Sequence, residues 1–584
     1  MTDDRIENRS GWPLRPVLLG GLGALACLAI QQIGDATPLG AAQRALMAAI
    51  ATGALAFGFT AERLRLGWAM IFATCVALVT GFVMWWNGAP DGNVWWAGGW
   101  NDASLFAAIA IAAPLFQTAR DEGQARFPYH QVHAHVWTNI VLWCASWAFV
   151  GITLTLSWLL AALFELIGID LLTRLLGKDW FEALLIGGAF GAALGLFRER
   201  EAVVRTLRRV VTTVLSVLAP VLGVGLVLFL LALPFTGLGA LWAATKATTP
   251  ILLACAFGAW VLANTVIGDG AEDEATNPAL RWGAIALGVV VLPLGVIAGI
   301  ATGLRIEQYG VTPERLWAVV FDAVAILVGL AYWIALARWR LGWAEEARPA
   351  NLRIAFVVAG IALFLATPIL SFNALSAHDQ VARLESGRVK ADKFDWAALA
   401  FDFGTPGKRA LQRLTHSKNA EIARAATQSI ATKNRQALVF QRVMTEQAIR
   451  LQRRLRVLPR AVPLPRGLAD ALGVYVCDAQ SEPTCILVWR PGAKEAVAIT
   501  GHCGVVADTE STGKTIRAWS NCSITHLIER RGEWSADADS GGLDLPNADR
   551  VIVAAALARG DIAIRPVQRR QVFIGGVPVG DTFE

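Results

Sequence analysis

The distribution of apolar residues constrains this chain more than any other feature. Eleven hydrophobic runs fall between residues 13 and 370, and residues 371–584 contain none. A run of about 20 apolar residues is long enough to cross the ~30 Å hydrocarbon core of a bilayer as an α-helix. We therefore predict an α-helical polytopic membrane bundle of about eleven spans, followed by an extracytoplasmic α+β domain. The expected spans are 13–33, 39–59, 67–87, 103–119, 137–165, 181–197, 210–233, 248–267, 279–303, 313–337 and 352–371.

The composition agrees with a membrane protein. The chain of 584 residues is 55% hydrophobic and 17% charged, with a mean hydropathy of +0.48, whereas soluble proteins carry about 25% charged residues. The first apolar run is longer than the core of a signal peptide, and no small-residue cleavage site follows it. We expect this run to be retained as the first span.

The orientation follows from the basic residues of the short connections, which concentrate on the cytoplasmic side of membrane proteins. With the N-terminus inside, seventeen basic residues fall on inner segments and five on outer ones. An outer connection, residues 85–100, holds five tryptophans and no Lys or Arg, which fits the preference of indole rings for the headgroup region. An odd number of spans then places the C-terminal domain outside.

The chain is expected to divide into three parts. Residues 1–371 form a transmembrane helical domain, residues 372–465 a basic and mostly helical juxtamembrane region, and residues 466–584 a small β-rich domain. In the last part, the pair Gly575-Gly576 stands between apolar residues and predicts a tight hairpin turn.

A basic stretch follows the last span. Residues 408–466 contain fourteen basic residues and two acidic ones. Just beyond the membrane, such a surface is suited to anionic lipid headgroups or to an acidic envelope polymer. The alternative is a solvated helical face beside negatively charged lipid. Nucleic acid is not expected as a partner, because no recognition motif accompanies the charge; the lipid bilayer is the partner that the composition implies.

Four of the eight cysteines fall inside the spans, where cysteine acts as a small apolar residue. The other four, Cys477, Cys485, Cys503 and Cys522, lie in the C-terminal domain. On the outer side of the membrane this number indicates two disulfides. Three pairings are possible, and we favour Cys477–Cys485 and Cys503–Cys522 because each closes a short loop. Free thiols or a metal site are the alternatives, but no CxxC motif supports zinc.

Asp322 is the most informative single residue. Its span opens with Thr312 as N-cap, followed by Pro313 and Glu314. Asp322 is about nine residues inside this helix, hence ~14 Å deep at 1.5 Å per residue. A carboxylate at such a depth costs several kcal/mol unless it is paired, protonated or hydrated. It serves either as a proton or cation relay or substrate contact, or as a hydrogen-bonded packing residue.

Arg44 and Glu165 are two further charges inside or near the expected spans, on the outer side. A pair between them would offset the cost of burying both; snorkelling of Arg44 to the interface is the alternative. Together with Asp322 they make up the intramembrane polar site that the sequence suggests.

No pattern assigns an enzymatic activity. His130, His133 and His135 cluster at the inner mouth of the fifth span, where interfacial hydrogen bonding is expected rather than a metal. Residues 511–515 lack the first glycine of a phosphate-binding loop. No serine-nucleophile elbow, zinc-protease helix or paired-carboxylate spacing occurs. We expect no cofactor and no metal.

Residues 305–317 read RIEQYGVTPERLW, and this segment resembles the signature of a bacterial inner-membrane family known as domain of unknown function 4153. The stretches 114–117, 135–139, 380–384, 386–388, 394–395 and 401–404 are similar to that family as well. The resemblance covers roughly residues 10–415. It implies many spans and a bacterial inner membrane, with a cytoplasmic N-terminus and a periplasmic C-terminal domain in our orientation. It implies no activity.

Within the resembling segment, Gln308, Tyr309 and Arg315 fall on an outer loop that leads into the helix of Asp322. This polar, aromatic loop either gates a pathway or forms a rigid connection held by the Thr312 cap. We favour the rigid connection.

Three functions are open at this stage, ranked in this order. The first is a transporter or exporter in which Asp322 titrates or binds a cation and the outer domain engages an envelope substrate; it predicts an internal cavity that reaches Asp322. The second is an envelope sensor or scaffold without transport activity, which predicts a tightly packed bundle. The third is an intramembrane transferase acting on a lipid-linked substrate, for which the chain offers few clustered polar residues.

Overall fold

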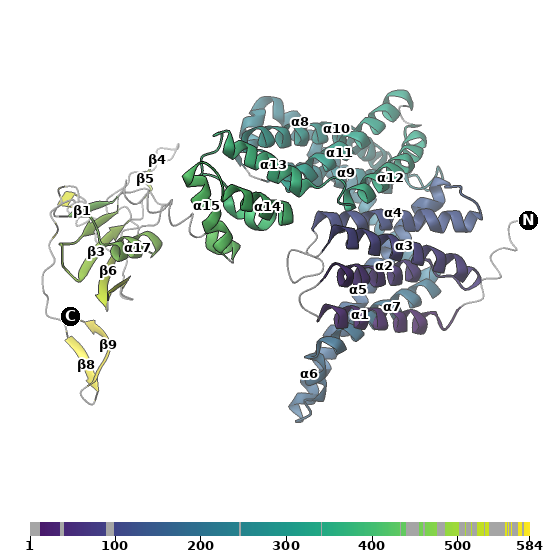
Figure 1. Ribbon diagram of the computed structural model, residues 1–584. Coiled ribbons are helices and arrows are strands. Elements are labelled where there is room, and N and C mark those ends of the chain that lie inside the picture. Colours follow the sequence, from purple (N-terminus) through teal and green to yellow (C-terminus); the bar gives the residue numbers. More distant parts are fainter. Residues whose placement is uncertain are drawn as a thin grey trace, which may run out of the picture. The chain divides into compact units, whose positions relative to one another are not determined.

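The computed structural model places residues in two compact units, 1–426 and 427–584 (Figure 1). The residues that it describes are 12–35, 40–88, 99–244, 247–339, 342–432, 434–439, 455–458, 462–475, 485–500, 508–509, 515–516, 523–530, 532–536, 555–556, 559, 562, 570–574 and 577–583.

Eleven helices in the described part of the first unit are long and apolar enough to cross a membrane, which confirms the predicted polytopic bundle. Each coincides with one of the apolar runs. They are α1 (Arg15–Gly34), α2 (Ala41–Thr60), α3 (Leu66–Asn87), α4 (Trp100–Glu122), α5 (Tyr129–Leu166), α7 (Asp179–Glu199), α8 (Glu201–Ala244), α9 (Thr248–Ile267), α10 (Pro278–Tyr309), α11 (Pro313–Trp339) and α12 (Ala344–Ala366). Gly237 interrupts α8 with a φ of 75°.

Helix α5 begins earlier than the sequence predicts, at Tyr129, so the three neighbouring histidines lie on its first turns. Its 38 residues correspond to about 57 Å at 1.5 Å per residue, well beyond one hydrocarbon core. In Figure 1 its C-terminal part and the short helix α6 (Leu171–Leu176) extend away from the other helices.

The spans pack in two groups. In the first, α1 packs on α7 and α2 on α3, and in the second, α10 packs on α8, α9 and α11. Contacts between α4 and α12 and between α5 and α8 join the groups. The largest core cluster belongs to the second group, where Leu287, Leu294 and Tyr332 are fully buried. This group also forms the walls of the candidate site.

Close backbone contact joins α1 and α7. Gly187, Gly191 and Gly195 recur every four residues on one face of α7 and lie against α1. A Cβ atom on Gly191 would come within 2.0 Å of the Leu19 carbonyl oxygen, and one on Gly23 within 2.2 Å of the Gly187 carbonyl oxygen. Apolar burial provides little drive for helix association inside lipid, so small residues that let backbones approach become decisive.

The described part of the segment that directly follows the last span is helical. It contains α13 (Phe372–Glu385), the π-helix η3 (Ala398–Asp402), α14 (Gly404–Leu414) and α15 (Ala420–Ala431). Helix α13 packs against α11 and α14, and the first compact unit extends to residue 426. Much of the basic stretch 408–466, including 440–454, lies outside the described residues.

The second unit has α+β structure, as predicted, although its first strand comes before residue 466. A five-stranded sheet has the order β1-β2-β3-β6-β7, with β1 parallel to β2 and the other pairs antiparallel. Its strands are β1 (Arg456–Leu458), β2 (Ile486–Val488), β3 (Glu495–Thr500), β6 (Ser523–Arg530) and β7 (Glu533–Ala536). The helix α17 (Arg466–Tyr475) contributes Leu468 and Leu472 to the core of this sheet, together with Leu487 and Leu527.

Two smaller pairs of strands complete the unit. They are β4 (Asp508–Thr509) with β5 (Thr515–Ile516), and β8 (Arg570–Ile574) with β9 (Val577–Phe583). The antiparallel pairing of β8 with β9 confirms the hairpin predicted around residues 575–576. Cys485 is buried beside β2. Cys477, Cys503 and Cys522 lie outside the described residues, so the disulfide pairings stay predictions.

Candidate functional site

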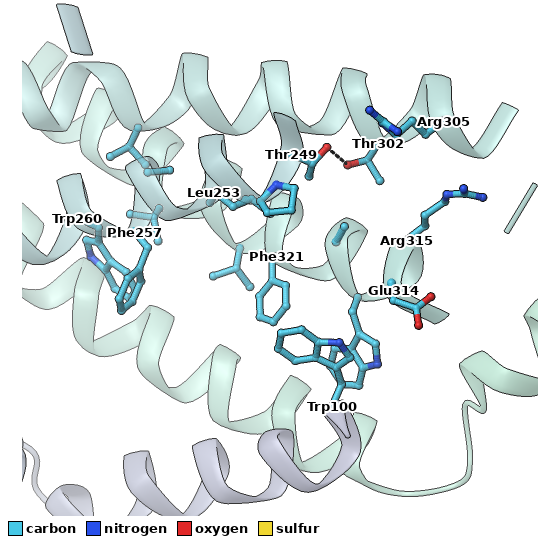
Figure 2. Close-up of a pocket in the computed structure, with 18 residues that line it drawn as sticks. Trp100, Thr249, Leu253, Phe257, Trp260, Thr302, Arg305, Glu314, Arg315 and Phe321 are labelled. Atoms are coloured by element: carbon cyan, nitrogen blue, oxygen red, sulfur yellow. Dashed lines mark hydrogen bonds between the residues drawn. The ribbon is translucent and has the colours of Figure 1, made fainter. Parts of the chain in front are cut away.

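A cavity of about 610 Å³ lies among α9, α10 and α11, with Trp100 of α4 at its edge. Figure 2 shows its two ends: Arg305, Glu314 and Arg315 lie at one, and Trp260 lies with a second aromatic ring at the other. This volume is within the range of about 300–1,000 Å³ that is usual for ligand sites. The cavity is therefore large enough for a small molecule or a lipid chain.

Two hydroxyl groups form a polar site in the otherwise apolar wall of the cavity. Thr249 of α9 and Thr302 of α10 face each other with 3.3 Å between their Oγ1 atoms (Figure 2). Thr302 also donates to the carbonyl oxygen of Ala298 at 2.9 Å. Both hydroxyls are buried, so a ligand in the cavity would meet them without competition from bulk water.

Asp322 lies behind this pair, on the face of α11 that packs against α10. It is 4% exposed, and within the described part of the chain neither carboxylate oxygen has a hydrogen-bond partner. Thr302 is nearby, but its single proton is already directed to Ala298. Asp322 is not one of the residues that line the cavity; Thr302 stands at the boundary between the two.

The start of α11 has the capping predicted from the sequence. The backbone N–H of Arg315 donates to Thr312 Oγ1 at 3.4 Å, and the N–H of Leu316 donates to the carbonyl oxygen of Thr312. Pro313 occupies the first helical position. The cap fixes the point at which α11 begins, and with it the depth of Asp322.

A buried polar network adjoins the Trp260 end of the cavity. Trp260 Nε1 donates to Asn351 Oδ1 at 3.2 Å, and Asn351 Nδ2 donates to Asn264 Oδ1 at 2.7 Å. Asn264 Nδ2 in turn donates to the Tyr332 hydroxyl at 2.9 Å. Tyr129 of α5 reaches the same Asn264 Oδ1 at 3.4 Å. Polar groups from α5, α9, α11 and α12 thus meet beside this end of the cavity.

The connection between α9 and α10 closes this end of the bundle. Arg348 of α12 donates to the carbonyl oxygen of Ile267 at 2.6 Å and pairs with Glu274 at 2.9 Å. In this connection, burial and then the neighbouring Asp273 carboxylate raise the pKa of Asp269 above its usual range. A titratable carboxyl group therefore lies at the end of the bundle opposite to Arg305.

The turn between α10 and α11 is held by α13. Gln380 Nε2 donates to the carbonyl oxygens of Tyr309 and Val311, each at 3.0 Å. Arg383 donates to the carbonyl oxygen of Gln308 at 2.8 Å, and the Val311 N–H donates to Asp379 at 2.8 Å. Two of the family-like stretches, 305–317 and 380–384, thus form one structural unit.

Arg315 completes this turn from inside α11. It donates to the carbonyl oxygen of Gly310 at 2.6 Å, and its guanidinium lies 5.6 Å from the centre of the Tyr309 ring. Gly310 has a φ of 80°, and a Cβ atom there would come within 2.7 Å of the side chains of Gln380 and Arg383. This dense bonding is what a rigid connection requires.

Arg44 has a different partner from the one considered in the sequence. It binds both carboxylate oxygens of Asp102 on α4, at 2.9 and 3.0 Å. Glu165 lies exposed at the end of α5, where it accepts a hydrogen bond from Thr173 at 3.5 Å. Arg44, Glu165 and Asp322 therefore do not form one site: Arg44 is part of a buried ion pair, and Asp322 stands apart from both.

The histidines make separate contacts on the first turns of α5. His133 accepts a hydrogen bond from Trp137 Nε1 at 3.1 Å, and His135 lies 3.1 Å from an oxygen of Asp121. Close by, Asn139 Nδ2 donates to Gln117 Oε1 at 2.9 Å. This last pair connects two more of the family-like stretches, 114–117 and 135–139.

Several residues of the site were missed in the sequence. Thr249, Thr302, Asn264 and Asn351 are neutral polar residues within apolar spans, and their position in those spans is the signal that marks them. Asp102 was missed as well; it follows directly on the tryptophan-rich connection 85–100. None of their partnerships can be deduced from spacing, because each joins two different helices.

Comparison with known proteins gives a family but no function. A family model described as "Domain of unknown function (DUF4153)" matches residues 46–402, more than half of the chain. The match covers the cavity, Asp322 and the turn held by α13, and it confirms the resemblance noted from the sequence. No curated protein and no solved structure matches the chain. The chain belongs to the DUF4153 family of integral membrane proteins.

Proposed function

We propose that this protein is a membrane transporter in which the substrate occupies the cavity among α9, α10 and α11, and in which Asp322 provides the charge change that drives the cycle. The observation that carries the proposal is the unpartnered carboxylate of Asp322 directly behind the cavity wall. An ionisable group in this position is by default a candidate for a proton or substrate pathway.

The other buried charges argue against a purely structural role for Asp322. Within the described residues, four arginines are also buried, and each has an acidic partner. These pairs are Arg15 with Glu199, Arg44 with Asp102, Arg120 with Glu62, and Arg348 with Glu274. Asp322 is the exception among these residues. A buried unpaired carboxylate lowers stability, and so its presence is better explained by a task that needs it.

The arrangement along the cavity supports the same proposal. Polar groups stand at both ends, with arginines at one and the Trp260–Asn351 network at the other, and apolar side chains lie between. A transporter needs a site that opens to either side in turn, with partners for the substrate at each end. A scaffold has no need of such a cavity.

The side of the membrane is part of the proposal. We infer a bacterial inner membrane, with a cytoplasmic N-terminus and a periplasmic tail. The alternation of the spans is supported by two ion pairs between different spans. Arg15–Glu199 and Arg44–Asp102 each join helix ends that the sequence assigns to the same side of the membrane. The absolute direction rests on the distribution of basic residues.

For the tail, we propose two disulfides among Cys477, Cys485, Cys503 and Cys522, and an anionic envelope polymer or lipid as the partner of the basic stretch 408–466. Treatment of intact cells with a charged, impermeant thiosulfonate, with and without a reductant, tests the disulfides. Full labelling of the tail without reductant would remove them from the account.

A sensor or scaffold is the second candidate, and one observation favours it. The bonds of Gln380 and Arg383 to the α10–α11 turn tie a segment outside the spans to the helix of Asp322. A partner that displaced α13 would act on α11 through these bonds. A sensor or scaffold requires no water in the cavity, so a test of whether the cavity is hydrated distinguishes it from a transporter.

Thiol labelling tests the transporter proposal. Ala325 lines the cavity, and Ala323 is exposed on the outside of the same helix at nearly the same depth. Each is replaced by cysteine in a background that lacks the span cysteines, and intact cells are treated with a charged, impermeant thiosulfonate. We expect Ala325→Cys to react, because the reagent needs water and a thiolate, and Ala323→Cys to stay unmodified in lipid.

The background used for labelling removes Cys27, Cys75, Cys144 and Cys255. Failure of Ala325→Cys to react, or equal reaction of both variants, would contradict a hydrated cavity and favour the scaffold. Reaction of Ala325→Cys in inverted vesicles but not in intact cells would leave the cavity in place and reverse the proposed orientation.

A further inference from the structure

The walls of the cavity are hydrocarbon and aromatic. Between its two ends lie apolar side chains such as Leu253 and Phe321 (Figure 2), and the threonine pair is the polar interruption among them. A small hydrophilic solute would lose its hydration there without regaining hydrogen bonds, which is costly. The occupant of this part of the cavity should therefore be largely apolar.

The mouth of the cavity has the opposite character. Arg305 and Arg315 line it together with one acid, Glu314. Within the described part of the chain, neither arginine has a carboxylate at ion-pair distance. Arg315 uses one nitrogen for the carbonyl oxygen of Gly310, and the guanidinium of Arg305 makes no hydrogen bond to the described residues. Guanidinium groups bind phosphate and carboxylate through paired N–H donors.

The position of the mouth fits the headgroup region of a bilayer. Arg305 is one turn from the end of α10 at Tyr309, and Arg315 is on the first turn of α11. Trp100 and Trp317, whose ring centres are 6.0 Å apart, stand beside it. Tryptophan and arginine at helix ends are the residues that mark this region.

We propose that the cavity binds a lipid with an anionic headgroup, its hydrocarbon chain along the apolar wall and its phosphate at Arg305 and Arg315. This names the substrate class of the transporter proposed above and rests on that proposal. The two arginines supply the charge that selects the headgroup, and the apolar wall supplies the affinity for the chain.

Binding is measured on the full-length protein, purified in a neutral detergent, by native mass spectrometry. The probes are phosphatidylglycerol, phosphatidylcholine and glycerol 3-phosphate. We expect phosphatidylglycerol to bind more tightly than phosphatidylcholine, and glycerol 3-phosphate not to bind detectably. Equal binding of the two lipids would overturn the inference; binding of glycerol 3-phosphate as tight as that of the lipid would assign a free phosphate site instead.

The charge is tested by Arg305→Gln. This side chain makes no described hydrogen bond to the protein, so its replacement leaves the α10–α11 turn intact, unlike a change at Arg315. We expect phosphatidylglycerol to bind about tenfold more weakly, or about 1.4 kcal/mol, with no change for phosphatidylcholine. Arg338→Gln is the control, because Arg338 is an exposed arginine at the other end of α11. Equal effects of the two variants would contradict the site.

The apolar wall is tested separately by filling it. Ala318→Trp places an indole in the cavity, whereas Val319→Trp places one on the outer face of α11, where Val319 is 43% exposed. We expect only the first to reduce phosphatidylglycerol binding. If neither does, the lipid is bound elsewhere.

The lipid-binding and thiol-labelling results together distinguish the lipid inference from the transporter proposal. Selective lipid binding with an unreactive Ala325→Cys would support the lipid site and contradict transport. A reactive Ala325→Cys without lipid selectivity would leave the transporter and remove the lipid as its substrate.

Discussion

The substitution Gly191→Ala is expected to destabilise the membrane unit by about 3 kcal/mol, at the upper end of the usual cost of overpacking. The added Cβ atom would lie 2.0 Å from the carbonyl oxygen of Leu19 and 2.6 Å from its carbonyl carbon. Both atoms belong to the backbone of α1, so no side chain can turn aside to make room. The two helices have to separate, and the contact that joins them is lost along its length.

Gly188→Ala is the matched control for this prediction. At Gly188 the nearest atoms to a new Cβ would be 3.7 and 3.9 Å away, which is ordinary contact. Alanine favours a helix over glycine by about 0.5–1 kcal/mol, so this variant is expected to be as stable as the parent or more so. The purified proteins are heated, and size-exclusion chromatography after heating measures how much native protein remains. The melting temperatures of the two variants are then compared. Equal melting temperatures for the two variants would show that α1 and α7 are not in backbone contact.

The second large effect comes from replacing two aspartates by asparagine. We expect the two substitutions to shift the melting temperature in opposite directions. Asp322→Asn is expected to raise the melting temperature, because it removes an ionisable group that has no partner at 4% exposure. An isolated charge in the middle of a span costs about 2.5–3.5 kcal/mol on insertion scales, and part of that cost is recovered by a neutral amide. The same variant is expected to lose transport.

Asp102→Asn is expected to lower the melting temperature. Arg44 is 5% exposed, and its Nη2 atom donates to the two carboxylate oxygens of Asp102 at 2.9 and 3.0 Å. Breaking a buried pair by removing one partner costs about 3–5 kcal/mol, because it leaves the other charge uncompensated. If Asp322→Asn were as destabilising as Asp102→Asn, Asp322 would be a packing residue and the transporter proposal would lose its main support.

The sequence predicts the membrane architecture well because a span is a local property. About 20 consecutive apolar residues suffice to identify each helix, and the start of α11 is set by Thr312 and Pro313, which are neighbours in the chain. The β8–β9 hairpin is likewise local. Asp322 could be found for the same reason, since one carboxylate in an apolar run is conspicuous without knowledge of its surroundings.

The partners of these residues could not be predicted, because they depend on which helices lie side by side. Arg44 and Asp102 belong to α2 and α4 and meet only through the packing of the bundle. The same holds for Thr249 with Thr302, and for Gln380 with the α10–α11 turn. A cavity is even harder to predict from local sequence, because it is the space that several helices leave between them.

Movement of a fluorescent lipid between leaflets tests the central claim most directly, namely that the cavity beside Asp322 is a route for an anionic lipid. Full-length protein is reconstituted into vesicles with phosphatidylglycerol labelled on its chain by nitrobenzoxadiazole, with and without an imposed pH gradient. Dithionite added outside destroys the label that reaches the outer leaflet. We predict complete loss of fluorescence with the parent protein, and loss of the outer-leaflet share alone with Asp322→Asn and in protein-free vesicles. Loss of the outer share alone with the parent, or complete loss with Asp322→Asn, would contradict the account.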